Sequence, residues 1–174
     1  MGKPVMKTTD ENGRDHFKGH AIASEQIAKT VMKRLKFDND TIRKVTKLVA
    51  YHDYRMEPTG ANVRRAMHEI GVELFPYYLA VRLADTKAQS SYERRGKLEN
   101  IIQIRELYRN ALRNKECVTL KDLAVTGTDL INLGIAPGKE LGTLLNELLD
   151  MVIEDPAWNQ KGKLCDYVKE RFGF

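Results

Sequence analysis

Hydrophobic positions recur at steps of three and four along most of the chain, which is the spacing of an amphipathic helix. In residues 20–35 the pattern runs through Ala21, Ile22, Ile27, Ala28, Val31 and Leu35. The same spacing predicts helices over 41–54, 60–71, 72–88, most of 87–115, 128–133, 138–154 and 159–172. The alternation typical of strands is nearly absent, and only the polar stretch Lys7–Arg14, with Asn12-Gly13 as its turn, fits a hairpin. The sequence therefore predicts an all-α fold.

Two acidic residues, Asp38 and Asp40, stand directly before the second predicted helix. Carboxylates at this position accept hydrogen bonds from the free N–H groups of the first turn. An Asp-x-Asp pair can also bind Mg²⁺ in polymerases, but no strand or Gly-Ser turn precedes this one. We therefore interpret both residues as helix-capping groups.

The positive charge of the chain is concentrated in one segment. Lys87–Lys115 contains eight Lys and Arg and three Glu, so its net charge of +5 equals that of all 174 residues. Leu98, Ile101, Ile104, Tyr108 and Leu112 predict a buried helix face there, and Arg105, Arg109 and Arg113 follow another face at steps of four. Like charges at that spacing repel, so an anionic partner such as a nucleic acid would relieve them. The alternative is a solvated face that Glu99 and Glu106 partly neutralise.

Length and composition suggest a cytoplasmic protein with one core and a smaller appendage, divided near 115–119 into residues 1–115 and 116–174. Cys117 and Cys165 are too few for a disulfide framework, and we interpret both as buried thiols. No apolar run approaches the roughly 20 residues of a membrane span. We therefore expect no membrane association.

Four metal-capable side chains fall on three predicted helices: His20, His52, Asp53 and Asp85. Imidazole and carboxylate groups are ligands for divalent metals such as Mg²⁺, Mn²⁺, Ni²⁺ or Zn²⁺, and a bound metal can activate water to attack a phosphoester. Convergence of these helices in a small bundle would bring the ligands together. Each residue also has a structural interpretation: His20 and Asp53 as local backbone contacts, and Asp85 as a partner of Arg82 or Lys87.

A glycine-rich stretch, Gly134 to Gly142, contains Pro137-Gly138-Lys139 directly before a predicted helix. Free N–H groups at such a helix start, together with Lys139, can hold a backbone phosphate. A tight corner between helices with no ligand is the alternative. Gly142, inside the helix, indicates close approach of another helix or of a phosphate strand.

Several of these motifs resemble one known family. Phe17-Lys18-Gly19-His20 with Ser24, the run Arg34-Leu35-Lys36-Phe37, and above all the stretch from Asp122 through Gly127-Thr128-Asp129-Leu130 to Gly142 are similar to the C-terminal part of bacterial tRNA nucleotidyltransferases, the CCA-adding enzymes and their poly(A) polymerase relatives. The resemblance covers nearly the whole chain, and its glycine-rich block is the most specific element. It implies an HD-like helical bundle followed by a smaller helical RNA-binding region.

The resemblance also implies what this chain does. The helical parts of the family hold tRNA, while an N-terminal head domain, expected to be missing here, carries the nucleotide-transfer site. Family members with the HD signature have a His-Asp dyad, an apolar residue and Gly-Lys-Pro, and here Met1 is followed by Gly2-Lys3-Pro4. We therefore expect a chain truncated at its N-terminus that binds tRNA or other RNA through Arg105, Arg109, Arg113, Gly138 and Lys139. The alternative is an HD-type metal-dependent phosphohydrolase acting on nucleotide or 2′,3′-cyclic phosphates, and surfaces left by the missing head can drive self-association.

Overall fold

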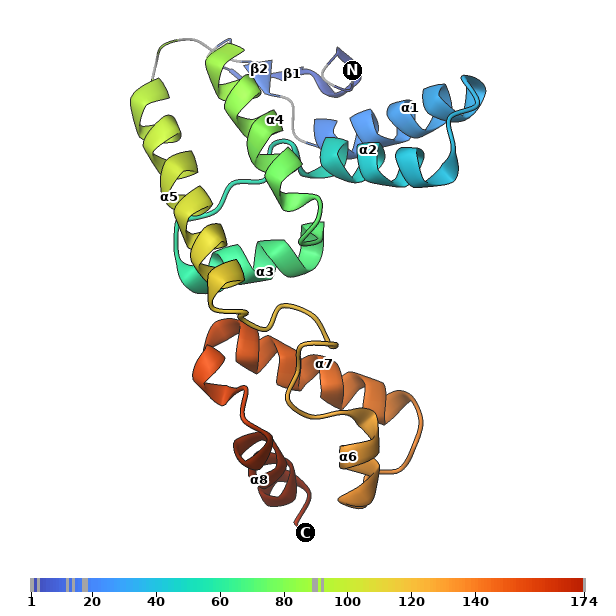
Figure 1. The fold of residues 1–174 in the computed structure, drawn as a ribbon. Coiled ribbons are helices and arrows are strands. Elements are labelled where there is room, and N and C mark those ends of the chain that lie inside the picture. The colour runs from blue at the N-terminus through green and yellow to red at the C-terminus, as the bar shows by residue number, and fades with distance from the viewer. Residues whose placement is uncertain are drawn as a thin grey trace. The chain divides into compact units, whose positions relative to one another are not determined.

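The computed structural model describes residues 2, 4–11, 13, 15–16, 19–88, 91 and 93–173. Eight α-helices dominate this part of the chain (Figure 1). They are α1 (His20–Arg34), α2 (Asn39–Tyr51), α3 (Gly60–Ile70), α4 (Phe75–Ala88), α5 (Arg94–Arg113), α6 (Gly127–Asn132), α7 (Lys139–Glu154) and α8 (Lys161–Phe172). The prediction of an all-α fold is confirmed.

The remaining elements are short. Two 3₁₀ turns, η1 (Pro4–Met6) and η2 (Pro156–Trp158), accompany two-residue strands β1 (Thr8–Thr9) and β2 (Asp15–His16). The strands pair antiparallel, with Thr8 opposite His16 and Thr9 opposite Asp15. A hairpin therefore exists where the polar N-terminal stretch predicted one, although Asn12 and Arg14 lie outside the described residues.

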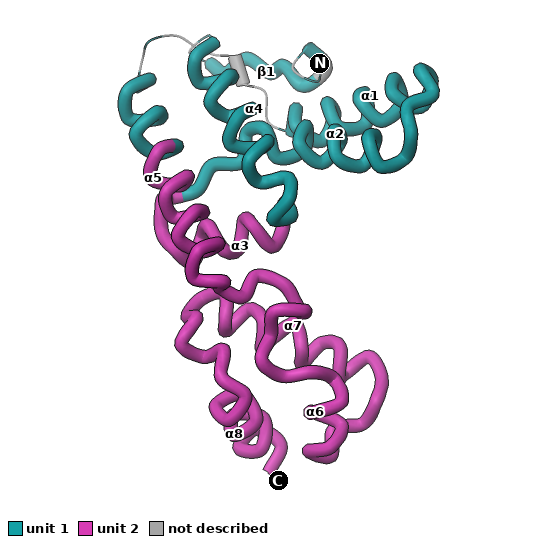
Figure 2. The backbone as a smooth tube through the Cα atoms, viewed as in Figure 1, with its two compact units in different colours: residues 1–56, 70–101 teal, residues 57–69, 102–174 magenta. Residues whose placement is uncertain are grey.

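The chain divides into two compact units (Figure 2). Unit 1 comprises residues 1–56 and 70–101, and unit 2 comprises residues 57–69 and 102–174. The expected division at 115–116 does not coincide with this one. Most of α3 belongs with the C-terminal helices, because its Arg64 side chain bonds to Glu116 and to the end of α7.

Each unit has its own apolar core. Buried hydrophobic residues of unit 1 include Ile42, Leu74, Phe75, Tyr78, Leu79 and Ile101. The core of unit 2 is a cluster built mainly from α6, α7 and α8 and the segment before them: Cys117, Leu123, Val125, Leu130, Ile135, Leu144, Leu148, Leu149, Val152, Ile153, Leu164 and Val168. Leucines at steps of three and four put one face of α7 into this cluster.

The two cysteines differ in environment. Cys117 is 2% exposed, and burial raises the pKa of its thiol to about 11. Cys165 is only partly buried against the unit 2 core. The expectation of two buried thiols is therefore right for Cys117 and too strong for Cys165.

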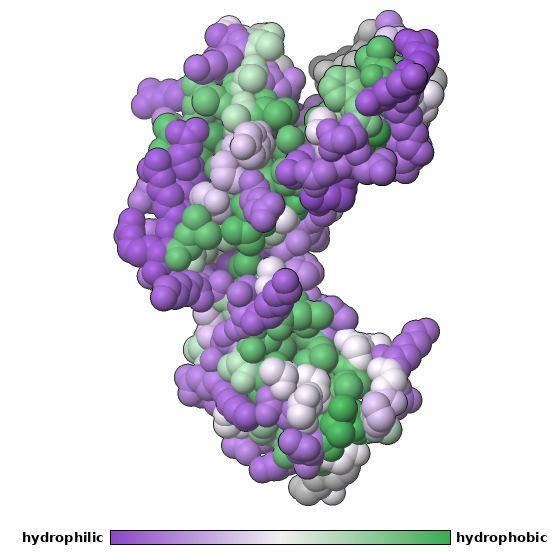
Figure 3. All heavy atoms as spheres, turned by 45° about the vertical axis from the view of Figure 1, so that its right-hand side comes forward, coloured by the Kyte–Doolittle hydropathy of each residue, from purple (hydrophilic) through white to green (hydrophobic). Residues whose placement is uncertain are grey.

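Some apolar surface remains accessible. Ile22, Tyr77 and Ile102 are each more than 60% exposed. Figure 3 shows hydrophobic residues scattered among hydrophilic ones on the face in view. Self-association through such surface stays a prediction. Across the described ranges, no helix combines the length and the apolar character needed to cross a membrane.

Candidate functional site

Two of the predicted metal ligands meet in unit 1. His20 is the first residue of α1 and His52 immediately follows α2, so the antiparallel packing of these helices brings the two rings together. Their Nε2 atoms are 3.1 Å apart, and the ring planes stand at 82° with centroids 5.0 Å apart. Residues 32 positions apart in sequence therefore form a direct pair.

The backbone of α2 orients the His52 ring. Its Nδ1 lies 2.6 Å from the Val49 carbonyl oxygen, which can only accept, so Nδ1 carries a proton. In the neutral ring Nε2 then has a free lone pair, and the Nε2–H of His20 donates to it. Metal-binding histidines are often oriented by the same kind of bond, from the second ring nitrogen to a backbone carbonyl. Two ligands at 2.0–2.1 Å from one metal would be about 3.0–3.4 Å apart, so the spacing also fits a shared cation, which would take the place of the proton on His20 Nε2.

The other two predicted ligands lie beside His52 in a small pocket of about 40 Å³, which we call the Arg82 pocket. It is lined by His52, Asp53, Arg55, Arg82, Asp85, Thr86 and Lys97. Asp53 is bound by Arg55, whose Nη2 is 3.3 Å from a carboxylate oxygen. The structure therefore brings His52, Asp53 and Asp85 to one pocket, whereas His20 contacts His52 without lining that pocket.

These residues fit a divalent metal only in part. The described residues contain no group of three or more His, Cys, Asp or Glu side chains that could hold a metal ion. The histidine pair supplies two nitrogen ligands, whereas three cationic side chains line the pocket that contains the two carboxylates. Because a catalytic metal normally has three protein ligands, no metal-dependent step can be derived from this arrangement.

Arg82 is held in the pocket by neutral groups. Its Nη1 donates to the Tyr78 hydroxyl at 3.2 Å, its Nη2 donates to Asn100 Oδ1 at 3.4 Å, and its guanidinium lies over the Tyr78 ring. Tyr78 in turn donates to the Tyr54 carbonyl at 2.7 Å. Burial raises the pKa of Tyr78, so this hydroxyl stays neutral. The sequence analysis considered Arg82 only as a partner for Asp85, but its bonds in the described part of the chain go to Tyr78 and Asn100 instead.

Gly2 packs against the first turn of α1, close to His20. Its N–H donates to Ser24 Oγ at 2.8 Å, and a Cβ at this position would lie 2.8 Å from the Ser24 nitrogen. Only glycine fits so close to another backbone. The neighbouring motif residues Met1, Lys3, Phe17 and Lys18 lie outside the described residues.

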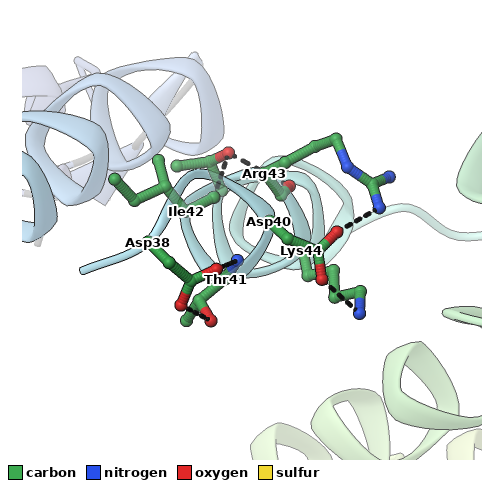
Figure 4. A network of polar contacts seen from close by, with 7 residues as sticks. Asp38, Asp40, Thr41, Ile42, Arg43 and Lys44 are labelled. Carbon is green, nitrogen blue, oxygen red and sulfur yellow. Dashed lines mark hydrogen bonds and ion pairs between the residues drawn. The ribbon is translucent and has the colours of Figure 1, made fainter.

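Asp38 caps α2 as predicted, whereas Asp40 lies in the first turn of the helix and pairs with side chains instead of capping it (Figure 4). Asp38 is the N-cap of α2 and accepts hydrogen bonds from the Thr41 N–H at 2.9 Å and the Thr41 hydroxyl at 2.6 Å. Asp40 forms ion pairs with Lys44 and Arg43. The Thr41 bonds lower the pKa of Asp38, and Lys44 and then Arg43 lower that of Asp40. Both carboxylates are therefore engaged locally.

The three predicted RNA-binding arginines lie along the second half of α5, within unit 2. Arg105 is half-buried, while Arg109 and Arg113 are exposed. Arg109 alone of the three has an ion pair among the described residues, to Glu106 at 3.6 Å. Ile101 and Ile104 are buried as predicted, but Leu112 is 45% exposed, because Ala111 takes the inward position of the last turn. Ile102 and Leu112 lie on the same face as the arginines, and all five residues fall within a stripe about 100° wide.

The start of α7 presents Gly138 and Lys139 to solvent. Gly138 is the N-cap with φ +148°, a backbone conformation that favours glycine, and it offers no side-chain cap. Lys139 is exposed, but Glu140 in the same turn opposes an anion there. The expected approach of another helix at Gly142 is wrong, since a Cβ built there meets nothing within 4 Å.

Sequence reasoning missed Thr86 and the role of Arg82. Both lie on α4 within four residues of Asp85, so they could have been grouped with it. The other residues that line their pocket, however, come from α5 and from the segment after α2, which the sequence does not place.

Comparison with known proteins gives the family. Residues 20–168 match the family of the tRNA nucleotidyltransferase domain 2. A CC-adding tRNA nucleotidyltransferase of Thermus thermophilus is 28% identical over 160 residues. The match covers 88% of this chain and 34% of that relative, so the chain spans about a third of the relative's length. No solved structure gives a significant match. Because the family match extends over most of the sequence, this chain belongs to the tRNA nucleotidyltransferase domain 2 family.

Proposed function

We propose that this chain is a tRNA-binding part of a tRNA nucleotidyltransferase, and that nucleotide transfer requires a head domain outside these 174 residues. The observation that carries the proposal is the stripe of Arg105, Arg109 and Arg113 on α5, in a chain of this family. Guanidinium groups form strong bidentate contacts with phosphates. Gly138 and Lys139 at the start of α7 would add one further contact to the backbone of the RNA.

The apolar members of the stripe fit the same partner. Ile102 and Leu112 are exposed beside the arginines, at 63% and 45%. Sugars and base faces offer apolar surface between phosphates, whereas a free counterion offers none. A mixed stripe therefore suits a polynucleotide better than it suits a small anion.

Binding to tRNA with an Arg105→Gln/Arg109→Gln variant tests this proposal. We expect the affinity measured by fluorescence anisotropy at low salt to fall on the order of tenfold, because two phosphate contacts are lost. The matched control is Arg43→Gln/Lys44→Gln, which removes the same charge from exposed positions on α2. Equal losses in the two variants, or no measurable tRNA binding by the native chain, would show that the stripe is not an RNA-binding surface.

The histidine pair supports a second candidate, a metal-dependent phosphohydrolase acting on nucleotide or 2′,3′-cyclic phosphates. The supporting observation is the 3.1 Å separation of the two Nε2 atoms with Nδ1 of His52 held by the backbone. Under this proposal, protein purified with Mn²⁺ or Ni²⁺ retains metal after dialysis. The His52→Gln variant loses that metal.

Elemental analysis and a 2′,3′-cyclic phosphodiesterase assay decide this candidate together. Removal of metal with a chelator should abolish turnover, and adding back Mn²⁺ should restore it. The matched control is His68→Gln, because His68 bonds to the Val118 carbonyl in unit 2 and does not belong to the pair. A native chain with neither bound metal nor turnover would rule the candidate out.

A further inference from the structure

The Arg82 pocket has the composition of an anion site. Its lining includes three cationic side chains, Arg55, Arg82 and Lys97, and two carboxylates, Asp53 and Asp85. One of the carboxylates is already paired, since Asp53 binds Arg55 at 3.3 Å. Together with His52, these groups favour a negative ligand over a positive one. The predicted metal ligands Asp53 and Asp85 therefore stand in a wall that is cationic overall.

Arg82 supplies the main attraction. Within the described part of the chain, its guanidinium bonds only to the Tyr78 hydroxyl and the Asn100 side-chain oxygen, and it forms no ion pair with a carboxylate. Two of its five N–H donors are used in this way, and three remain. Asp53 and Asp85 line the same pocket, but neither bonds to Arg82, so its remaining donors are available to a ligand. A phosphate in the pocket would accept from these donors.

Asn100 also fixes the direction of Arg82. The Asn100 amide nitrogen donates to the Met56 carbonyl at 3.3 Å, so its oxygen is turned toward Arg82. Tyr78 is fixed in the same way by the Tyr54 carbonyl. The Arg82 guanidinium is therefore held in one orientation before a ligand binds, which reduces the entropy lost on binding.

Thr86 adds a hydrogen-bond donor to the pocket. It lines the pocket and is only 7% exposed, yet no group among the described residues hydrogen-bonds to its hydroxyl. A threonine inside a helix commonly donates to the carbonyl four residues earlier, as Thr46 does to Ile42 at 2.8 Å. The oxygen of this hydroxyl is not among the fully buried side-chain atoms that lack a partner, so it is open to the pocket and can bond to a molecule there. A phosphate oxygen in the pocket would accept from it.

The size of the pocket sets the ligand class. A water molecule needs at least about 10–15 Å³ on this measure, so a pocket of about 40 Å³ holds one compact group of a few heavy atoms. We propose that the Arg82 pocket binds a single phosphate group, with Arg82 and Thr86 as donors and Lys97 at its edge. The phosphate belongs either to an RNA strand or to a small phosphate compound. All residues of the site belong to unit 1. Assigning the phosphate to an RNA strand depends on the proposed function, whereas phosphate binding itself does not.

Titration with inorganic phosphate, followed by amide NMR spectra of the whole chain, tests the site. We expect signals of residues 82–86 to shift in the native chain. Thr86→Val keeps the side-chain shape and removes only the hydroxyl, and it should weaken phosphate binding about tenfold. Arg82→Gln should weaken binding at least as much. The control Arg95→Gln removes a charge from a highly exposed position on α5 and should leave phosphate binding unchanged.

The same variants identify the source of the phosphate. A loss of tRNA affinity in Thr86→Val that parallels the loss of phosphate binding would assign the pocket to RNA. Unchanged tRNA affinity with weakened phosphate binding would assign it to a small phosphate compound. No shift at residues 82–86 with phosphate, or shifts there with Mn²⁺ and none with phosphate, would overturn the proposal. The Arg105→Gln/Arg109→Gln variant should retain phosphate binding. If the chain binds phosphate in this pocket but does not bind tRNA, the tRNA proposal fails while the phosphate site stands.

Discussion

Arg64 shows how much one side chain can contribute to this fold. It is buried in unit 2, where Nε and Nη2 donate to the Ile153 and Glu154 carbonyls at 2.7 and 3.0 Å and Nη1 binds Glu116 at 2.8 Å. Those carbonyls belong to the last turn of α7, which lacks partners of its own. The positive charge also complements the negative end of the helix dipole.

We expect Arg64→Met to lower the free energy of unfolding by about 3 kcal/mol, because it leaves a half-buried carboxylate and two carbonyls without their donor. Urea denaturation, followed by the fluorescence of the single tryptophan, Trp158, measures the change. Arg65→Met is the neighbouring control. Arg65 pairs with Glu154 at 3.2 Å, and both side chains are exposed. Loss of this pair should therefore lower the free energy of unfolding by less than about 1 kcal/mol. Equal effects would contradict the structural role assigned to Arg64.

At the scale of the element, α6 begins with a set of local polar contacts. It has six residues, and its start is a capping box in which Thr126 and Asp129 bond to each other's backbone N–H. Asp129 also binds Lys161, the first residue of α8, at 2.5 Å. Bonding to Lys161 and then to Thr126 lowers the pKa of Asp129 to about 2. One carboxylate therefore joins the start of α6 to the start of α8.

This depressed pKa makes a prediction about acid stability. The unfolded carboxyl has a pKa of about 3.9, so its contribution is complete above that pH and is lost as pH falls through about 2. Asp129→Asn should therefore lower the melting temperature at about pH 5 to 7, and the difference from the native chain should shrink between about pH 4 and pH 2. A difference that stays constant with pH would show that the charge of Asp129 is not what stabilises α6.

At the scale of the whole molecule, charge governs the expected partner. The chain carries a net charge of +5, and the segment from Lys87 to Lys115 contains as much by itself. Arginines that contact phosphates release counterions from the nucleic acid, so the affinity falls as salt rises. The salt dependence therefore reports how many contacts the chain makes.

We expect the logarithm of the tRNA association constant to fall linearly with the logarithm of salt concentration. Arg105→Gln/Arg109→Gln should reduce the slope by about 1.5, since each lost phosphate contact accounts for roughly 0.7 to 0.9. Anisotropy titrations at several salt concentrations provide the measurement. If the slope is the same in the variant and the native chain, the two arginines do not contact phosphates.

The sequence by itself determined the helices and their ends. Apolar spacing and capping depend on residues within a few positions of each other, so α1, α3 and α4 begin or end within a few residues of their predicted bounds. The cap at Asp38 followed from the same local rules. No strand or Gly-Ser turn precedes Asp38, so the sequence also favoured a helix cap over a magnesium site there. Leu112 is the exception, because helical spacing allowed Ala111 to face inward instead.

Only the tertiary structure decided which distant groups meet. His20 reaches His52 because α1 and α2 pack antiparallel, while Arg64 reaches Glu154 across 90 positions. In the sequence, Arg82 and Thr86 are ordinary helix residues, and their burial beside Asp85 depends on how α4 packs with α5 and with the segment after α2. Local spacing sets which face a residue occupies, but the dielectric environment and the neighbours of that face come from packing. For that reason candidate metal ligands could be identified from the sequence, whereas the charged groups around them are known only from the tertiary structure.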